Sequence, residues 1–346
     1  MKFISKTHFN SYEQIFSKKF VSKLSFLLAT SAFFLSYSCF SYSMSALDMS
    51  STLVSVETEK TKVPISFTLS TGVLNGESHE YAYYQTGEKL SELTWNLDNV
   101  IMVGGQISAD ITKRINLNAG TWVKATAPST TMSDYDWTDI NDLDQRTHWS
   151  ETETELEKGI MADININGVV LTSDMCSVSA IAGFHYDNWK WNSMDGVFSY
   201  PNGSGRLSDV IPGMGSNDSS SIYEQKFYAP YLGFGFNSNS SKWLFNSRII
   251  ATPFARAESI DKHVLRNYMY EDTFKDVLYI SAGASYAYLF TDSFSVSVSI
   301  DYQTYDSTKG DEKITNLSTG ETFEFSDIAG ISHESYMVSL GTKYRF

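Results

Sequence analysis

The last twelve residues of the chain, SYMVSLGTKYRF at positions 335–346, decide its fold class. Large apolar side chains fall on one side of this stretch, at Tyr336, Val338, Leu340, Tyr344 and Phe346. Small or charged residues fall on the other side, at Ser335, Ser339, Gly341, Lys343 and Arg345. Successive side chains of a β-strand point to opposite faces, so this alternation predicts a strand with one apolar face.

The same alternation recurs along the chain, for example over residues 65–73, 160–167 and 294–302. An outward apolar face and an inward polar face are typical of a barrel in lipid, where closure pairs every backbone group. The aromatic end at Phe346, with Tyr344 two positions earlier, resembles the closing strand of bacterial outer-membrane barrels. A soluble β-sandwich would also alternate, but it would not require this ending.

Ten strands are expected, at residues 64–84, 89–110, 115–136, 154–171, 176–192, 220–236, 243–263, 273–290, 294–306 and 330–346. Their connections alternate in length, with short ones at 112–114, 172–175, 237–242 and 291–293, and long polar ones around 137–153, 193–219, 264–272 and 307–329. Short periplasmic turns and long outer loops are the outer-membrane pattern. We therefore predict an all-β protein, a ten-stranded antiparallel transmembrane β-barrel with long extracellular loops.

The first 45 residues predict a signal peptide, because lysines precede an apolar run from Leu24 to Phe40 and small residues follow it. An uncleaved anchor is the alternative. Cleavage there would remove five lysines and one glutamate and leave a barrel of residues 46–346 with net charge −18. A surface this acidic argues against nucleic acid as a partner and suits cationic substrates.

Two acidic clusters stand at predicted outward ends of strands. Asp134 and Asp136 share the inward parity of their strand, and Asp261 and His263 are also two residues apart. On this second strand, however, odd-numbered residues are apolar near the start, so a shift of register is needed. Pro253 cannot donate to the ladder and is the expected bulge site.

These four residues have a recognisable chemistry. A neutral imidazole held by a carboxylate can take a proton from water, and two close carboxylates can share a proton and orient that water. Such a site needs neither a metal nor a covalent nucleophile. The usual alternative for acidic loop residues on an acidic protein is simple solvation.

Several motifs resemble those of the omptin family of outer-membrane proteases, over nearly the whole mature chain. They are Asp134-Tyr135-Asp136-Trp137, Asp261-Lys262-His263, Pro230-Tyr231-Leu232-Gly233 and the ending Gly341-Thr342-Lys343-Tyr344-Arg345-Phe346. The resemblance implies an aspartic-type endopeptidase that cuts cationic, dibasic peptides and proteins at the cell surface. It assigns the catalytic roles to Asp134, Asp136, Asp261 and His263.

The resemblance also implies binding residues. Glu80 matches the family's acid for the basic side chain before the cut, while the companion acid falls at Ser259, beside Glu258. Lipopolysaccharide, implied as an activator, would contact Lys226 and Lys190 on the outer wall. We expect no metal, no other cofactor and a monomer. The rival hypothesis is a non-catalytic barrel that acts as an adhesin or a structural surface protein.

Overall fold

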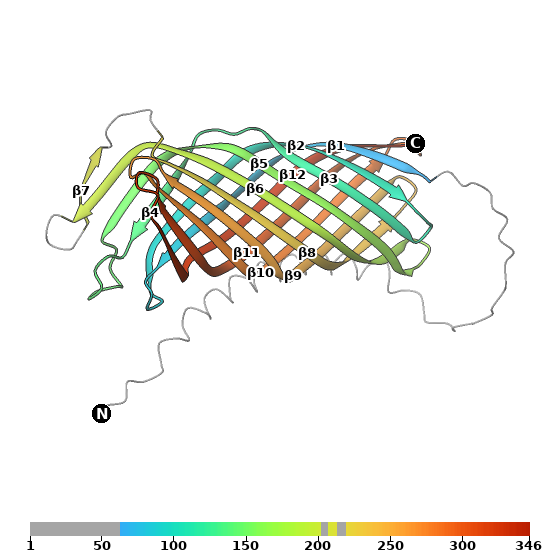
Figure 1. Cartoon of the computed structure of the whole chain (residues 1–346). Helices are drawn as coiled ribbons and strands as arrows, with labels where there is room; N and C mark the ends of the chain where they lie inside the picture. Colours follow the sequence, from blue (N-terminus) through green and yellow to red (C-terminus); the bar gives the residue numbers. More distant parts are fainter. Residues whose placement is uncertain (1–62, 202–206, 213–218) are drawn as a thin grey trace, which may run out of the picture. The chain divides into compact units, whose positions relative to one another are not determined.

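The computed structural model describes residues 63–201, 207–212 and 219–346, so the predicted signal peptide at 1–45 lies outside the described residues. In these ranges every regular element is a β-strand (Figure 1). The strands are β1 (Ile65–Tyr83), β2 (Lys89–Asp110), β3 (Ile115–Thr126), β4 (Thr130–Asp136), β5 (His148–Thr172), β6 (Cys176–Pro201), β7 (Leu207–Pro212), β8 (Ser221–Asn239), β9 (Trp243–His263), β10 (Tyr268–Leu289), β11 (Phe294–Asn316) and β12 (Thr322–Arg345). The described residues contain no helix that is long and apolar enough to span a bilayer.

The strands close into an antiparallel barrel. Strands consecutive in the sequence pair with each other, except β3 with β4 and β7 with β8. In addition, β3 pairs with β5, β6 pairs with β8, and β12 pairs with β1. Both β3 and β4 lie between β2 and β5, so together they form the one predicted strand at 115–136, interrupted at residues 127–129. The short β7 pairs only with the end of β6. The predicted barrel is therefore confirmed, with ten positions around its wall.

The predicted long loops are mostly paired strands, which corrects the sequence-based boundaries. β11 and β12 continue as a hairpin to a turn at residues 317–321, and β5 begins at His148. Both faces of such a hairpin meet water, so apolar residues do not alternate there and the sequence resembles a loop. We call the end with the turns 84–88, 137–147, 264–267 and 317–321 the hairpin rim. It is opposite the short turns at 111–114, 173–175, 240–242 and 290–293.

A belt of apolar side chains covers the outer wall toward the short-turn end. On β12 its members Tyr336, Val338 and Leu340 are about half exposed, and the partner strands β1 and β11 contribute Val73 and Ile300. Apolar side chains at this exposure match a lipid-facing band. The carboxyl-terminal strand therefore faces outward as the alternation predicts, and the hairpin rim lies beyond the belt.

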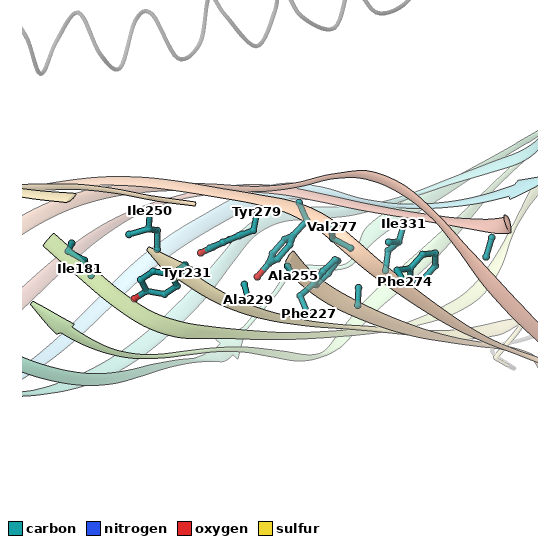
Figure 2. Close-up of a cluster of buried hydrophobic side chains, with 13 residues drawn as sticks. Ile181, Phe227, Ala229, Tyr231, Ile250, Ala255, Phe274, Val277, Tyr279 and Ile331 are labelled. Carbon is teal, nitrogen blue, oxygen red and sulfur yellow. The ribbon is translucent and has the colours of Figure 1, made fainter. Parts of the chain in front are cut away.

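Side chains from opposite walls meet inside the barrel. Tyr305 of β11 donates to Asp187 of β6 at 2.8 Å, and the rings of Phe227 and Tyr305 stack with centroids 4.0 Å apart. Figure 2 shows Phe227, Tyr231 and Tyr279 in the same buried cluster. These contacts bridge the lumen, so the hairpin rim opens onto a filled barrel.

The predicted bulge at Pro253 is present. The even-numbered residues Ile250 and Thr252 are buried, Pro253 and Phe254 are both exposed, and odd-numbered side chains are buried from Ala255 to Asp261. The pairing with β10 shifts in the same region, where Asp276 has a φ of 55°. An extra residue in one strand reverses which face its later side chains occupy. The bulge therefore turns the end of β9 inward.

Close contact between β8 and β9 depends on Gly233. A Cβ at this position would meet the Ile249 carbonyl oxygen and lie 2.8 Å from the Ile250 Cα. We expect Gly233→Ala to destabilise the barrel by about 1–3 kcal/mol, as overpacking does. Gly168→Ala is the control, because nothing lies within 4 Å of its added Cβ. The midpoint of urea unfolding, followed by heat-modifiable electrophoretic mobility, should fall for Gly233→Ala only; equal midpoints would contradict this account.

Candidate active site

The end of β9 holds an aspartate–histidine couple. Asp261 is fully buried, and its Oδ2 lies 2.5 Å from His263 Nε2, while the His263 side chain stays 25% exposed. Ser221 Oγ on β8 donates a short hydrogen bond to Asp261 Oδ1. The His263 ring also packs on Tyr270 of β10, with centroids 5.0 Å apart. The carboxylate is thus fixed from two sides, and the imidazole is held at the opening.

A pair of aspartates lies on β4, between β2 and β5. Ser91 Oγ donates to Asp134 Oδ1 at 3.0 Å. Burial, with repulsion from Asp136 added, raises the pKa of Asp134 to about 7. Burial also raises the pKa of Asp136. Two such carboxylates can hold one proton between them near neutral pH.

The two couples face each other across the hairpin rim. In one direction around the barrel, three strands lie between β4 and β9, namely β5, β6 and β8. In the other direction five strands lie between them, namely β2, β1, β12, β11 and β10. The two strands therefore stand on opposite walls. His263 and Arg266 act on Asp134 electrostatically and offset part of the rise in its pKa. We call the space between the two couples the cleft. It has carboxylates on one side and an imidazole on the other.

Aromatic side chains form the floor of this cleft. Trp95, Trp191 and Tyr223 are fully buried, and their ring centroids lie 5.0 to 6.2 Å apart. Trp191 Nε1 on β6 also donates to the Asn96 carbonyl on β2 at 3.4 Å. Trp95 is the register partner of Met132, which lies two residues before Asp134 on β4. The aromatic floor therefore lies farther from the hairpin rim than the aspartates do.

The predicted binding residues divide between the cleft and the outer wall. The Oε2 atom of Glu80 is buried, and Asp261, Asp272 and Asp134 are near enough to raise the Glu80 pKa further above the effect of burial. Ser259 is 2% exposed and faces the interior. Glu258 lies on the opposite face of β9, exposed and beside Tyr228, so the structure does not bring it together with Glu80 and Ser259.

Both lysines predicted to contact lipopolysaccharide point outward. Lys190 Nζ lies 2.6 Å from Glu157, and Lys226 Nζ lies 3.8 Å from Glu224. Lys158 adds a third ammonium, 3.2 Å from Glu224. The outer wall therefore carries a small cluster of paired lysines rather than free cations.

Sequence reasoning missed three residues of the cleft. Ser221 supports Asp261 from a neighbouring strand, Arg266 in the β9–β10 turn acts electrostatically on both aspartates of β4, and Asp272 of β10 accepts a hydrogen bond from Ser259. No local motif marks them, because each acts on a residue of another strand. In the described residues, no group of three or more histidine, cysteine and acidic side chains is arranged to hold a metal.

Comparison with known proteins assigns the family. The model of the Omptin family matches residues 61–346. The chain belongs to the omptin family. The plasminogen activator of Yersinia pestis is 30% identical to it over 289 residues, which cover 82% of this chain and 90% of that protein. The outer membrane protease IcsP of Shigella flexneri is 25% identical over 290 residues, with coverage of 82% and 90%.

This omptin also shares its fold with a solved structure. The crystal structure of the outer membrane protease OmpT from Escherichia coli superposes with a TM-score of 0.78 at 22% identity, covering 82% of this chain and 97% of that one. Membership of a family whose named members are outer-membrane proteases supports a peptidase function in the outer membrane for this omptin.

Proposed function

We propose that this omptin is an aspartic-type endopeptidase that hydrolyses peptide bonds of cationic substrates in the cleft at the hairpin rim. The observation that carries the proposal is the contact of 2.5 Å between buried Asp261 and partly exposed His263, on the wall opposite Asp134 and Asp136. His263 would act as general base, Asp261 would orient the imidazole, and the aspartate pair would hold the attacking water.

Each step of this mechanism uses a side chain in the cleft. The imidazole nitrogen that faces away from Asp261 takes a proton from the water, whose oxygen attacks the peptide carbonyl. The imidazolium is stabilised by Asp261 and can return the proton to the leaving amine. Asp134 and Asp136 fix the water, because an ionised carboxylate accepts a hydrogen bond from the water O–H that does not face the imidazole.

The hairpin rim would face the outside of the cell. Support comes from the short turns and the carboxyl terminus, which lie together at the other end, as in outer-membrane barrels with periplasmic termini. Lipopolysaccharide would bind the outer wall at Lys190 and Lys226, where its phosphates would replace Glu157 and Glu224 as partners of the ammonium groups.

Cleavage of a basic peptide tests the function directly. Purified barrel reconstituted with lipopolysaccharide should cut a peptide rich in arginine and lysine, and kcat/KM should fall as salt screens the acidic cleft. A peptide of the same length with glutamine at the basic positions is the control and should stay intact. A folded barrel that leaves the basic peptide uncut would support the rival, a non-catalytic surface protein.

A further inference from the structure

An acidic side chain from β10 occupies the place beside Ser259. Ser259 Oγ donates to Asp272 Oδ2 at 2.6 Å, and the two residues are register partners with 2% and 4% of their surfaces exposed. Asp272 reaches the interior because β10 changes parity at Lys275 and Asp276, which are both exposed. Position 259, where family resemblance places an acid, thus has its carboxylate supplied by the neighbouring strand.

Glu80 and Asp272 belong to one buried acidic group. Asp272 is among the charges that raise the pKa of Glu80, and Glu312 is the register partner of Asp272 on β11. Among the described residues, no ion pair with lysine or arginine involves any of these three carboxylates. Burial is the main cause that raises the pKa of Asp272 to about 8 and that of Glu312 to about 7. The group lacks a cation that would stabilise its charge.

Three buried acceptor atoms in this group have no hydrogen-bond donor. They are Glu80 Oε2, Asp272 Oδ1 and Gln225 Oε1. Gln225 on β8 is the register partner of Ser259 and is fully buried, and its Nε2 already donates to the His79 carbonyl at 3.1 Å and to Tyr223 Oη at 2.7 Å. Its amide is therefore fixed with the oxygen as the free acceptor. Buried acceptors without donors are unfavourable, so their presence together points to a ligand that donates.

The chemistry of that ligand follows from the acceptors. A guanidinium supplies five donors and one positive charge, and an ammonium supplies three donors and the same charge. Either group would neutralise part of the acidic cluster and satisfy the three oxygens. A neutral side chain of similar size would leave the carboxylates uncompensated.

We propose that Asp272, together with Glu80 and Gln225, selects a basic side chain next to the scissile bond, in place of an acid at position 259. This proposal rests on the proposed endopeptidase function. Ser259 lies two residues before Asp261 on the same face of β9, about 7 Å along the strand. A cation held beside Ser259 would therefore place a neighbouring peptide bond near the aspartate–histidine couple. Asp272 is a specificity residue and takes no part in the proton transfers.

An exchange of the two side chains tests the proposal. Three variants are compared with wild type: Asp272→Ser, the double exchange Ser259→Asp with Asp272→Ser, and Glu271→Gln as control. Glu271 carries the same charge on the same strand but faces the other side, where it pairs with Lys313 at 2.8 Å. The substrates are two fluorogenic peptides with arginine or its neutral isostere citrulline before the cut.

The readout is the ratio of kcat/KM for the arginine peptide to kcat/KM for the citrulline peptide. We expect Asp272→Ser to lower this ratio about 10- to 100-fold, mainly through KM for the arginine peptide, because one buried charge partner is lost. The double exchange should restore most of the ratio, and Glu271→Gln should keep it. An unchanged ratio in Asp272→Ser, or equal losses for both peptides, would overturn the proposal.

A binding measurement separates this proposal from the proposed function. The uncleavable probe is the arginine peptide with a reduced peptide bond, titrated against the lipopolysaccharide-reconstituted barrel. If wild type cuts neither peptide but binds the arginine probe at least tenfold more tightly than Asp272→Ser does, the protease function fails and the cation site stands. If wild type cuts the arginine peptide while Asp272→Ser binds the probe equally well, the cation site fails and the protease function stands.

Discussion

His263→Ala should lower kcat for a dibasic peptide by about 10³-fold or more, because removing a general base commonly forfeits 10²- to 10⁴-fold. The imidazole is the part of the couple that reaches the opening, while Asp261 behind it is fully buried. Alanine leaves nothing in its place to accept the proton of the attacking water. The measurement is steady-state cleavage of a fluorogenic peptide by the reconstituted barrel.

Lys262→Ala is the matched control for this variant. Lys262 lies between the two members of the couple but points outward and is exposed. It should keep kcat within about twofold, since exposed substitutions rarely disturb a distant group. Both variants should retain heat-modifiable mobility. Wild-type rates in a folded His263→Ala barrel would rule out the imidazole as the base.

Asp136→Asn should lower kcat by about 10²- to 10³-fold and also move the acid limb of the pH profile. Below its raised pKa of about 7, Asp134 binds a proton, so the couple loses one of the two charges that orient the water. Repulsion from Asp136 is one cause of that raised pKa. Its removal should lower the pKa of Asp134, so the acid limb of the residual kcat/KM should shift to lower pH.

The control for Asp136→Asn lies in the same hairpin. Asp142 is an exposed aspartate in the β4–β5 turn, so Asp142→Asn removes a similar charge away from the cleft. It should change neither kcat nor the position of the acid limb. An acid limb that stays in place in Asp136→Asn would mean that the two aspartates do not titrate as a pair.

The sequence predicts the barrel wall well because lipid imposes a strict pattern there. Leu340 and Val338 alternate with small residues since one face meets hydrocarbon and the other meets a packed interior. Beyond the apolar belt both faces meet water, and the constraint disappears. This is why the extension of β11 to Asn316 and the start of β12 at Thr322 are not visible in the composition.

The candidate site is only partly predictable for a related reason. The inward orientation of Asp261 could be predicted, because Pro253 marks a bulge in the sequence. The corresponding bulge on β10 contains no proline. It is marked by the positive φ of Asp276, which the sequence does not show. Without that bulge Asp272 would face outward, so its contact with Ser259 could not be foreseen. Ser221 likewise depends on which strand pairs with β9.

The central claim is that the two couples on opposite walls form one active site. A double-mutant cycle on kcat/KM between Asp136→Asn and Asp261→Asn, with a dibasic peptide as substrate, tests it most directly. Residues that act as a unit show strongly non-additive losses, so the double variant should be within about tenfold of the weaker single variant. Losses that multiply, with the double variant reduced by the full product of the two single effects, would contradict a shared site.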